Sequence, residues 1–168
     1  MSLIQSKIDT NILFERWETP VGKSNELWLW RQLYTTFNIY LFFQRNHDSP
    51  SDEYYVLTIN GDDPFRLTEE GLGSNTVGGL ITGKDATFCE CLEYRTFKVW
   101  NTSFANKSFS GLVISEQEYV KKEKFQYLIY TQDTWIEFVA FKPPQWEFHQ
   151  NKKLDDLVIQ YLRKDTLD

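Results

Sequence analysis

Side chains that commonly build catalytic and metal sites are scarce in this chain. Its 168 residues include two histidines and two cysteines, Cys89 and Cys91. The cysteines are two positions apart on a predicted strand, where a disulfide would be strained, so we predict reduced thiols. A zinc site would need three or four ligands of these types, and no local spacing supplies them. The sequence therefore predicts no disulfide, no metal and no cofactor.

Long apolar runs and positive charge are also scarce. Residues 1–10 lack the apolar centre of a secretory signal, and the richest apolar window, residues 27–43, is interrupted by polar side chains such as Arg31 and Asn38. The net charge is −6, whereas binding to a nucleic-acid backbone needs a positive surface. We therefore predict a cytoplasmic protein with no membrane span and no free nucleic acid as partner.

No motif of a catalytic machine is complete. Residues 78–84 match the opening of a phosphate-binding loop, but Asp85 stands where that loop needs a hydroxyl, and a strand-like pattern follows. No Gly-x-Ser-x-Gly sequence marks a nucleophile. His47 and His149 are predicted to be surface residues. The sequence therefore predicts no catalytic residue, and leaves open an enzyme whose groups meet only in the fold.

Aromatic residues, in contrast, are abundant, with six Trp, nine Tyr and thirteen Phe. Each buried ring removes about 150–250 Å² of surface from water, so a few rings dominate a core or an interface. Most of the rings fall in segments with strand-like patterns. The excess therefore predicts a ring-packed β core, with a surplus of rings that could serve a partner or a ligand.

Alternating apolar and polar residues predict a mainly β chain. Polar turns pair residues 36–44 with 53–60, and residues 125–130 with 134–141, as two hairpins. Residues 26–34 fit a helix or a strand, with the strand slightly favoured. Further extended segments are expected at 12–17, at 86–101 with a break near 93–95, and at 110–115, and a glycine-rich loop at 68–79.

The clearest helical pattern lies near the end of the chain. Apolar residues recur at helical spacing from Leu154 to Leu162, within a predicted helix of residues 151–164. Strands followed by one amphipathic helix predict a single α+β domain over residues 1–168, with residues 1–10 disordered or poorly packed. The expected architecture is an antiparallel β-barrel or a strongly curved sheet, with the helix packed against it.

Both faces of some predicted strands carry apolar side chains. Leu41 and Phe43 share one face of residues 36–44, and Tyr40 and Phe42 share the other. The same holds for residues 125–141, so these strands are expected to be central. A helix or second sheet could cover the second face; otherwise its rings line a pocket or form an exposed patch.

The favoured functional hypothesis is a non-enzymatic protein-interaction module with an acidic face and surface aromatics. Its partner would be basic, because complementary charge raises the rate of association. Such a module could be an inhibitor, an immunity protein or an assembly factor, and the sequence does not select among these three roles. The predicted contact residues are Asp48, Asp52, Glu53, Tyr54, Asp62 and Asp63.

Two other hypotheses compete with it. The chain could be a calycin-like β-barrel carrier of a planar or apolar ligand such as a lipid or pigment. The predicted pocket residues are then Trp28, Trp30, Tyr40, Phe42, Trp135 and Phe138. The third hypothesis is an enzyme with an unrecognised site, which predicts a concave pocket holding titratable groups with shifted pKa values.

Overall fold

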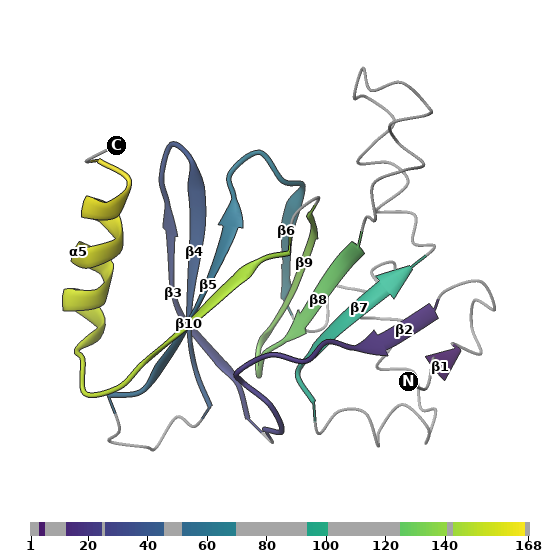
Figure 1. Cartoon of the computed structure of the whole chain (residues 1–168). Coiled ribbons are helices and arrows are strands. Elements are labelled where there is room, and N and C mark those ends of the chain that lie inside the picture. Colours follow the sequence, from purple (N-terminus) through teal and green to yellow (C-terminus); the bar gives the residue numbers. More distant parts are fainter. Residues whose placement is uncertain are drawn as a thin grey trace.

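The computed structural model describes residues 4–5, 13–24, 26–45, 52–69, 94–100, 125–140 and 143–166 (Figure 1). These residues form strands and one helix near the end of the chain. The strands are β1 (Ile4–Gln5), β2 (Leu13–Arg16), β3 (Trp28–Tyr34), β4 (Asn38–Gln44), β5 (Tyr54–Asn60), β6 (Phe65–Glu69), β7 (Thr96–Trp100), β8 (Phe125–Tyr130), β9 (Thr134–Ala140) and β10 (Gln145–His149), and the helix is α5 (Leu154–Lys164).

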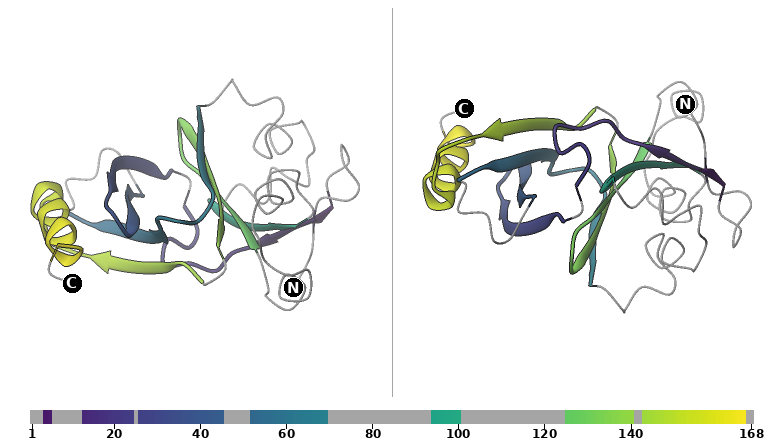
Figure 2. Two further views of the ribbon diagram at one scale, coloured as in Figure 1. Left: turned by 90° about the horizontal axis from the view of Figure 1, so that it is seen from above. Right: turned by 90° about the horizontal axis from the view of Figure 1, so that it is seen from below.

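The strands form two antiparallel sheets. One has the order β1-β2-β7-β8-β9-β6, and the other has the order β10-β5-β4-β3. Helix α5 lies against the four-stranded sheet, on the side away from the six-stranded sheet (Figures 1 and 2). The mainly β prediction with a C-terminal helix is confirmed. Among the described strands neither sheet closes on itself, so the predicted barrel is not confirmed.

An inter-sheet core lies between the two sheets. Alternate residues of β4 point into it from one side, and alternate residues of β8 and β9 enter from the other. Rings interlock here: Tyr127 stacks on Phe138 at 5.1 Å between centroids, and Trp17 lies 4.5 Å from Tyr127. Burial raises the pKa of the Tyr127 hydroxyl to about 12. Each fully buried large side chain contributes about 1.5–3 kcal/mol.

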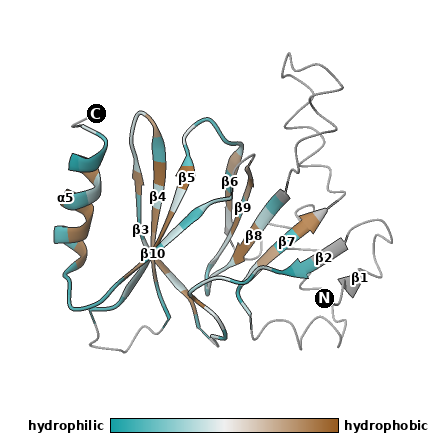
Figure 3. Ribbon diagram, viewed as in Figure 1, coloured by the Kyte–Doolittle hydropathy of each residue, from teal (hydrophilic) through white to brown (hydrophobic). Residues whose placement is uncertain are grey.

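A second, helix-side core lies between the four-stranded sheet and α5. Tyr40 and Phe42 on the sheet pack against Leu157 and Tyr161 on the helix. Both faces of β4 are therefore covered, which explains why both carry apolar residues. The helix begins at Leu154, three residues after the predicted start at 151, and ends at Lys164 as predicted. It has hydrophobic and hydrophilic residues along its length (Figure 3).

The segment that the sequence left open between helix and strand is strand β3. Its pairing with β4 shifts between Leu29 and Arg31 at a bulge. Before the bulge, Leu29 packs against the inter-sheet core; after it, Leu33 packs against the helix-side core. An inserted residue reverses which face the later side chains occupy, so it disrupts the regular alternation of a strand.

Both predicted hairpins are confirmed, as β4–β5 and β8–β9, and β8 and β9 are central in their sheet. Strand β6 was missed: no element was predicted for residues 65–67 and a loop was predicted for residues 68–79, whereas β6 extends to Glu69. Several predicted features lie outside the described residues: most of residues 1–10, the glycine-rich motif, Cys89, Cys91, His47 and segment 110–115. In the described part of the chain, no helix has the length and apolar character to cross a membrane.

Candidate interaction site

The predicted acidic residues lie at opposite ends of β5. Asp52, Glu53 and Tyr54 are at its start, and Asp62 and Asp63 follow its end. Seven extended residues span about 20 Å, so the two groups do not form one continuous face. Asp48 lies outside the described residues. The two ends of the strand are therefore separate surfaces with different neighbours.

The end that carries Asp62 and Asp63 is a groove, which we call the Phe37 groove. Its volume is about 520 Å³. Phe37, 60% exposed, presents an aromatic ring there, and no lysine or arginine is among the described lining residues. The lining residues are Thr36, Phe37, Asn38, Thr58, Ile59, Asn60, Asp62, Asp63, Pro143, Pro144 and Gln145.

Two tight turns build this groove. In the turn between β3 and β4, the Thr35 backbone N–H donates to the Asn38 carbonyl at 2.9 Å, which leaves Phe37 near the tip. In the turn after β5, the Gly61 N–H donates to the Phe37 carbonyl at 2.8 Å. A Cβ at position 61 would lie 3.1 Å from that carbonyl oxygen. The absence of a side chain at Gly61 thus allows the two turns to meet.

The other end of β5 has different neighbours. The Gln150 amide donates to the Glu53 carboxylate at 3.0 Å, and the Lys152 backbone N–H donates to the Asp52 carbonyl at 3.3 Å. Tyr54 is buried in the helix-side core. This end is therefore part of the connection from β10 into α5.

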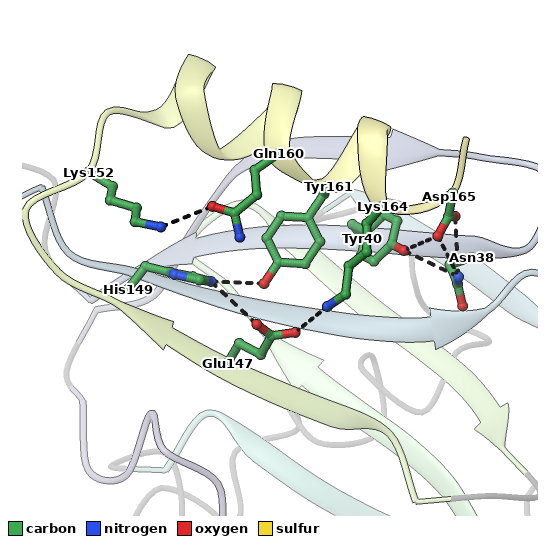
Figure 4. Close-up of polar contacts among 9 residues, drawn as sticks. All are labelled: Asn38, Tyr40, Glu147, His149, Lys152, Gln160, Tyr161, Lys164 and Asp165. Atoms are coloured by element: carbon green, nitrogen blue, oxygen red, sulfur yellow. Dashed lines mark hydrogen bonds and ion pairs between the residues drawn. The ribbon is translucent and has the colours of Figure 1, made fainter. Parts of the chain in front are cut away.

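Polar contacts join the second half of α5 to strand β10 (Figure 4). The His149 Nε2 atom and the Tyr161 hydroxyl share a hydrogen bond of 2.8 Å, and the Lys164 ammonium lies 3.0 Å from the Glu147 carboxylate. Burial lowers the pKa of His149, and the charge of Lys152 lowers it further. Burial raises the pKa of Glu147, but hydrogen bonds from Lys164 and Tyr161 outweigh it and lower the pKa overall.

The end of α5 is held by Asp165 (Figure 4). Its carboxylate accepts hydrogen bonds from the Tyr40 hydroxyl at 2.5 Å, from the Asn38 amide at 3.1 Å and from the Thr35 hydroxyl. Burial opposes ionisation, but these donors lower the pKa of Asp165. An acid at a helix C-terminus opposes the helix dipole, so the donors explain its presence. Asp165 thereby ties the helix to the turn that carries Phe37.

A buried ion pair lies on the face of β9 away from the inter-sheet core. The fully buried Glu137 carboxylate accepts bonds from Arg66 at 2.6 and 2.9 Å and from the Gln126 amide at 2.9 Å. The two-pronged contact gives the charge strong, well-directed partners. Removing one partner of such a pair typically costs about 3–5 kcal/mol. We assign this cluster a structural role.

The predicted pocket residues do not surround one cavity. Tyr40 and Phe42 lie in the helix-side core, and Phe138 lies in the inter-sheet core. Trp135 is buried and stacks on Tyr130 at 4.2 Å between ring centroids. The remaining two, Trp28 and Trp30, are on β3, and none of the six lines the Phe37 groove.

The surface prediction for His149 is wrong, because its side chain is only 12% exposed. Phe37 was missed as a site residue, although the predicted β4–β5 hairpin places the start of β4 beside the end of β5, and hence Phe37 beside Asp62. Within the described residues, no group of three or more His, Cys, Asp or Glu side chains could hold a metal.

Comparison of the chain with family models, curated proteins and solved structures found no match.

Proposed function

We propose that the protein is a non-enzymatic interaction module that receives a basic segment of a protein partner in the Phe37 groove. The observation that carries this proposal is the placement of two carboxylates, Asp62 and Asp63, in one groove with the exposed ring of Phe37. An exposed large ring beside prolines offers apolar contact to a partner side chain. The carboxylates select lysine or arginine beside that side chain.

The two kinds of contact have different roles in binding. Exposed charge pairs contribute about 0.2–1 kcal/mol each and are screened by salt, so the acids mainly raise the rate of association. The ring supplies apolar contact that salt does not weaken. We therefore expect the affinity to fall as salt is added and to level off at a residual apolar contribution.

The two competing functions have less support from the described residues. A carrier needs rings around a cavity, whereas Tyr40, Phe42 and Phe138 are packed in the two cores. An enzyme needs shifted titratable groups in a concave pocket, whereas Glu147 and His149 lie beneath α5 and do not line the Phe37 groove. Their contacts instead connect β10 to the helix.

A displayed library of random peptides tests the proposal. Selection on the wild-type protein is expected to enrich sequences with lysine or arginine next to an aromatic or aliphatic residue. The affinity of a synthetic selected peptide is then measured by fluorescence anisotropy from low to high salt. Replacing Asp62 and Asp63 together by Asn should weaken binding about three- to tenfold at low salt, and Phe37→Ser should weaken it about tenfold at any salt.

The opposite end of β5 supplies a matched control. The double variant Asp52→Asn and Glu53→Gln changes the net charge by the same two units but alters no residue of the Phe37 groove. It should change the affinity less than about twofold, because charges about 20 Å away are screened. Equal weakening by both double variants would show general charge attraction and would overturn the proposal.

A further inference from the structure

The outer face of α5 combines apolar and charged side chains that no described element covers. Leu157 and Tyr161 on the inner face are fully buried, whereas Ile159 and Leu162 are each 46% exposed. Figures 1 and 2 show α5 at the outside of the molecule, with the four-stranded sheet on its inner side. This short helix therefore presents two partly exposed aliphatic residues that a partner could contact.

The charges on this helix are arranged by sign. Asp155 and Asp156 lie in the first turn, and Arg163 and Lys164 lie in the last turn. Ile159 is at the midpoint between Leu154 and Lys164. If a second copy of the helix runs antiparallel and crosses at Ile159, Asp155 of each copy lies opposite Arg163 of the other.

We propose that α5 pairs with α5 of a second copy of this chain, in an antiparallel twofold arrangement centred on Ile159. A twofold contact uses the same surface on both copies, which requires a self-complementary surface, and acid-to-base order along an antiparallel helix meets that requirement. Asp155, Ile159 and Leu162 follow the spacing of four and three that forms a helix–helix seam. A shallow groove along α5, lined by Asp156, Ile159, Gln160, Arg163 and Lys164, borders this seam at Ile159.

The length of the contact limits its strength. Eleven helical residues span about 16 Å, so the pair buries less than the roughly 1,200 Å² of a stable interface. The dimer is therefore weak and forms as the protein concentration rises. It shares no residue with the Phe37 groove, so it stands independently of the proposed binding function.

Sedimentation equilibrium over a range of concentrations tests the apolar centre of the contact. The wild-type average mass should rise toward twice the monomer mass, whereas Ile159→Glu should stay monomeric. Phe148→Glu is the matched control, because Phe148 is 47% exposed but lies on β10, and the charge change is the same. It should self-associate like the wild type. A wild type that stays monomeric, or an Ile159→Glu variant that still dimerises, would overturn the proposal.

A charge swap tests the antiparallel register. Asp155 is 88% exposed, and its contact with Arg31 is long, at 3.9 Å, so it can be changed with little effect on the fold. Asp155→Arg and Arg163→Glu should each weaken self-association at least about tenfold, since each change acts twice in a twofold dimer. An equimolar mixture of the two variants should restore association as a mixed pair. No association in the mixture would overturn the antiparallel arrangement.

Discussion

The two ends of the four-stranded sheet carry similar acids in different surroundings. At the start of β5, the Glu53 carboxylate accepts a hydrogen bond from Gln150, and the Asp52 backbone carbonyl accepts one from the Lys152 backbone N–H, so both contact the segment that leads into α5. After the end of β5, Asp62 and Asp63 line a groove beside the exposed ring of Phe37. Acidic composition alone therefore does not define a binding face. The neighbours of each carboxylate decide whether it can select a partner.

Helix α5 connects these two ends and is held differently at each. Toward the first end, neutral His149 and Tyr161 share a hydrogen bond. Toward the second, the Asp165 carboxylate accepts bonds from the turn that carries Phe37. The ring of Tyr161 lies 4.9 Å from that of Tyr40, whose hydroxyl donates to Asp165. Contacts at one end are thereby linked to contacts at the other.

The largest effect is expected from removing the ring that links the ends. Tyr161→Ala deletes a fully buried ring and should lower the free energy of unfolding by about 3–5 kcal/mol. Tyr161→Phe keeps the ring and loses the hydroxyl, which should cost about 1 kcal/mol. Urea unfolding measures both values. Equal losses in the two variants would show that the hydroxyl, and not the ring, stabilises the helix.

A smaller effect is expected at the groove end. Asp165→Asn removes a charged acceptor from Thr35, Asn38 and Tyr40 and should lower the free energy of unfolding by about 1–2 kcal/mol. Because Thr35 and Asn38 flank the Phe37 turn, it should also weaken peptide binding. Glu53→Gln, at the other end, should do neither. If Asp165→Asn left peptide affinity intact, the turn would not depend on the helix for its position.

The smallest effect is a difference in the acid sensitivity of the two ends. The pKa of His149 is lowered below its ordinary 6.5, so the folded state binds fewer protons, and stability falls as the pH drops from about 6.5 through that lowered value. The pKa of Asp165 is also lowered, so its contribution is present above about 3.8 and is lost only below that pH.

Unfolding experiments from pH 7 to pH 3 separate these two contributions. His149→Gln should flatten the fall in stability that begins near pH 6.5, whereas Asp165→Asn should leave that fall and flatten the change below about pH 3.8. The two ends of α5 would then respond to acid in sequence. An unchanged slope in the His149→Gln variant near pH 6 would contradict the assignment of the first response.

The sequence predicts those parts of the fold that depend on local pattern. The spacing from Leu154 to Leu162 gives α5, and the polar turn between β8 and β9 gives their hairpin. The division into two sheets does not follow from pattern, because β4 and β9 both have apolar residues on both faces although only β4 contacts α5. The bulge in β3 also obscures its alternation, since it reverses the face after Leu29.

Part of the candidate site could be predicted from the sequence. An antiparallel hairpin places the residues before its first strand beside those after its second, so the predicted pairing of β4 with β5 implies that Phe37 and Asp62 are neighbours. The same pairing separates Asp52 from Asp62. The contact of Asp165 with Thr35 was not predictable, because it joins residues from the two halves of the chain with no shared motif.

The most direct test of the proposed function locates a bound peptide on the protein. A selected basic peptide is titrated into uniformly ¹⁵N-labelled protein, and the shifts of backbone amides are followed by NMR. We predict that the largest shifts fall on residues 36–38 and 60–63, the two turns that build the Phe37 groove, and that residues 52–54 change little. Largest shifts at residues 52–54, or on α5, would contradict the assignment of the groove as the binding site.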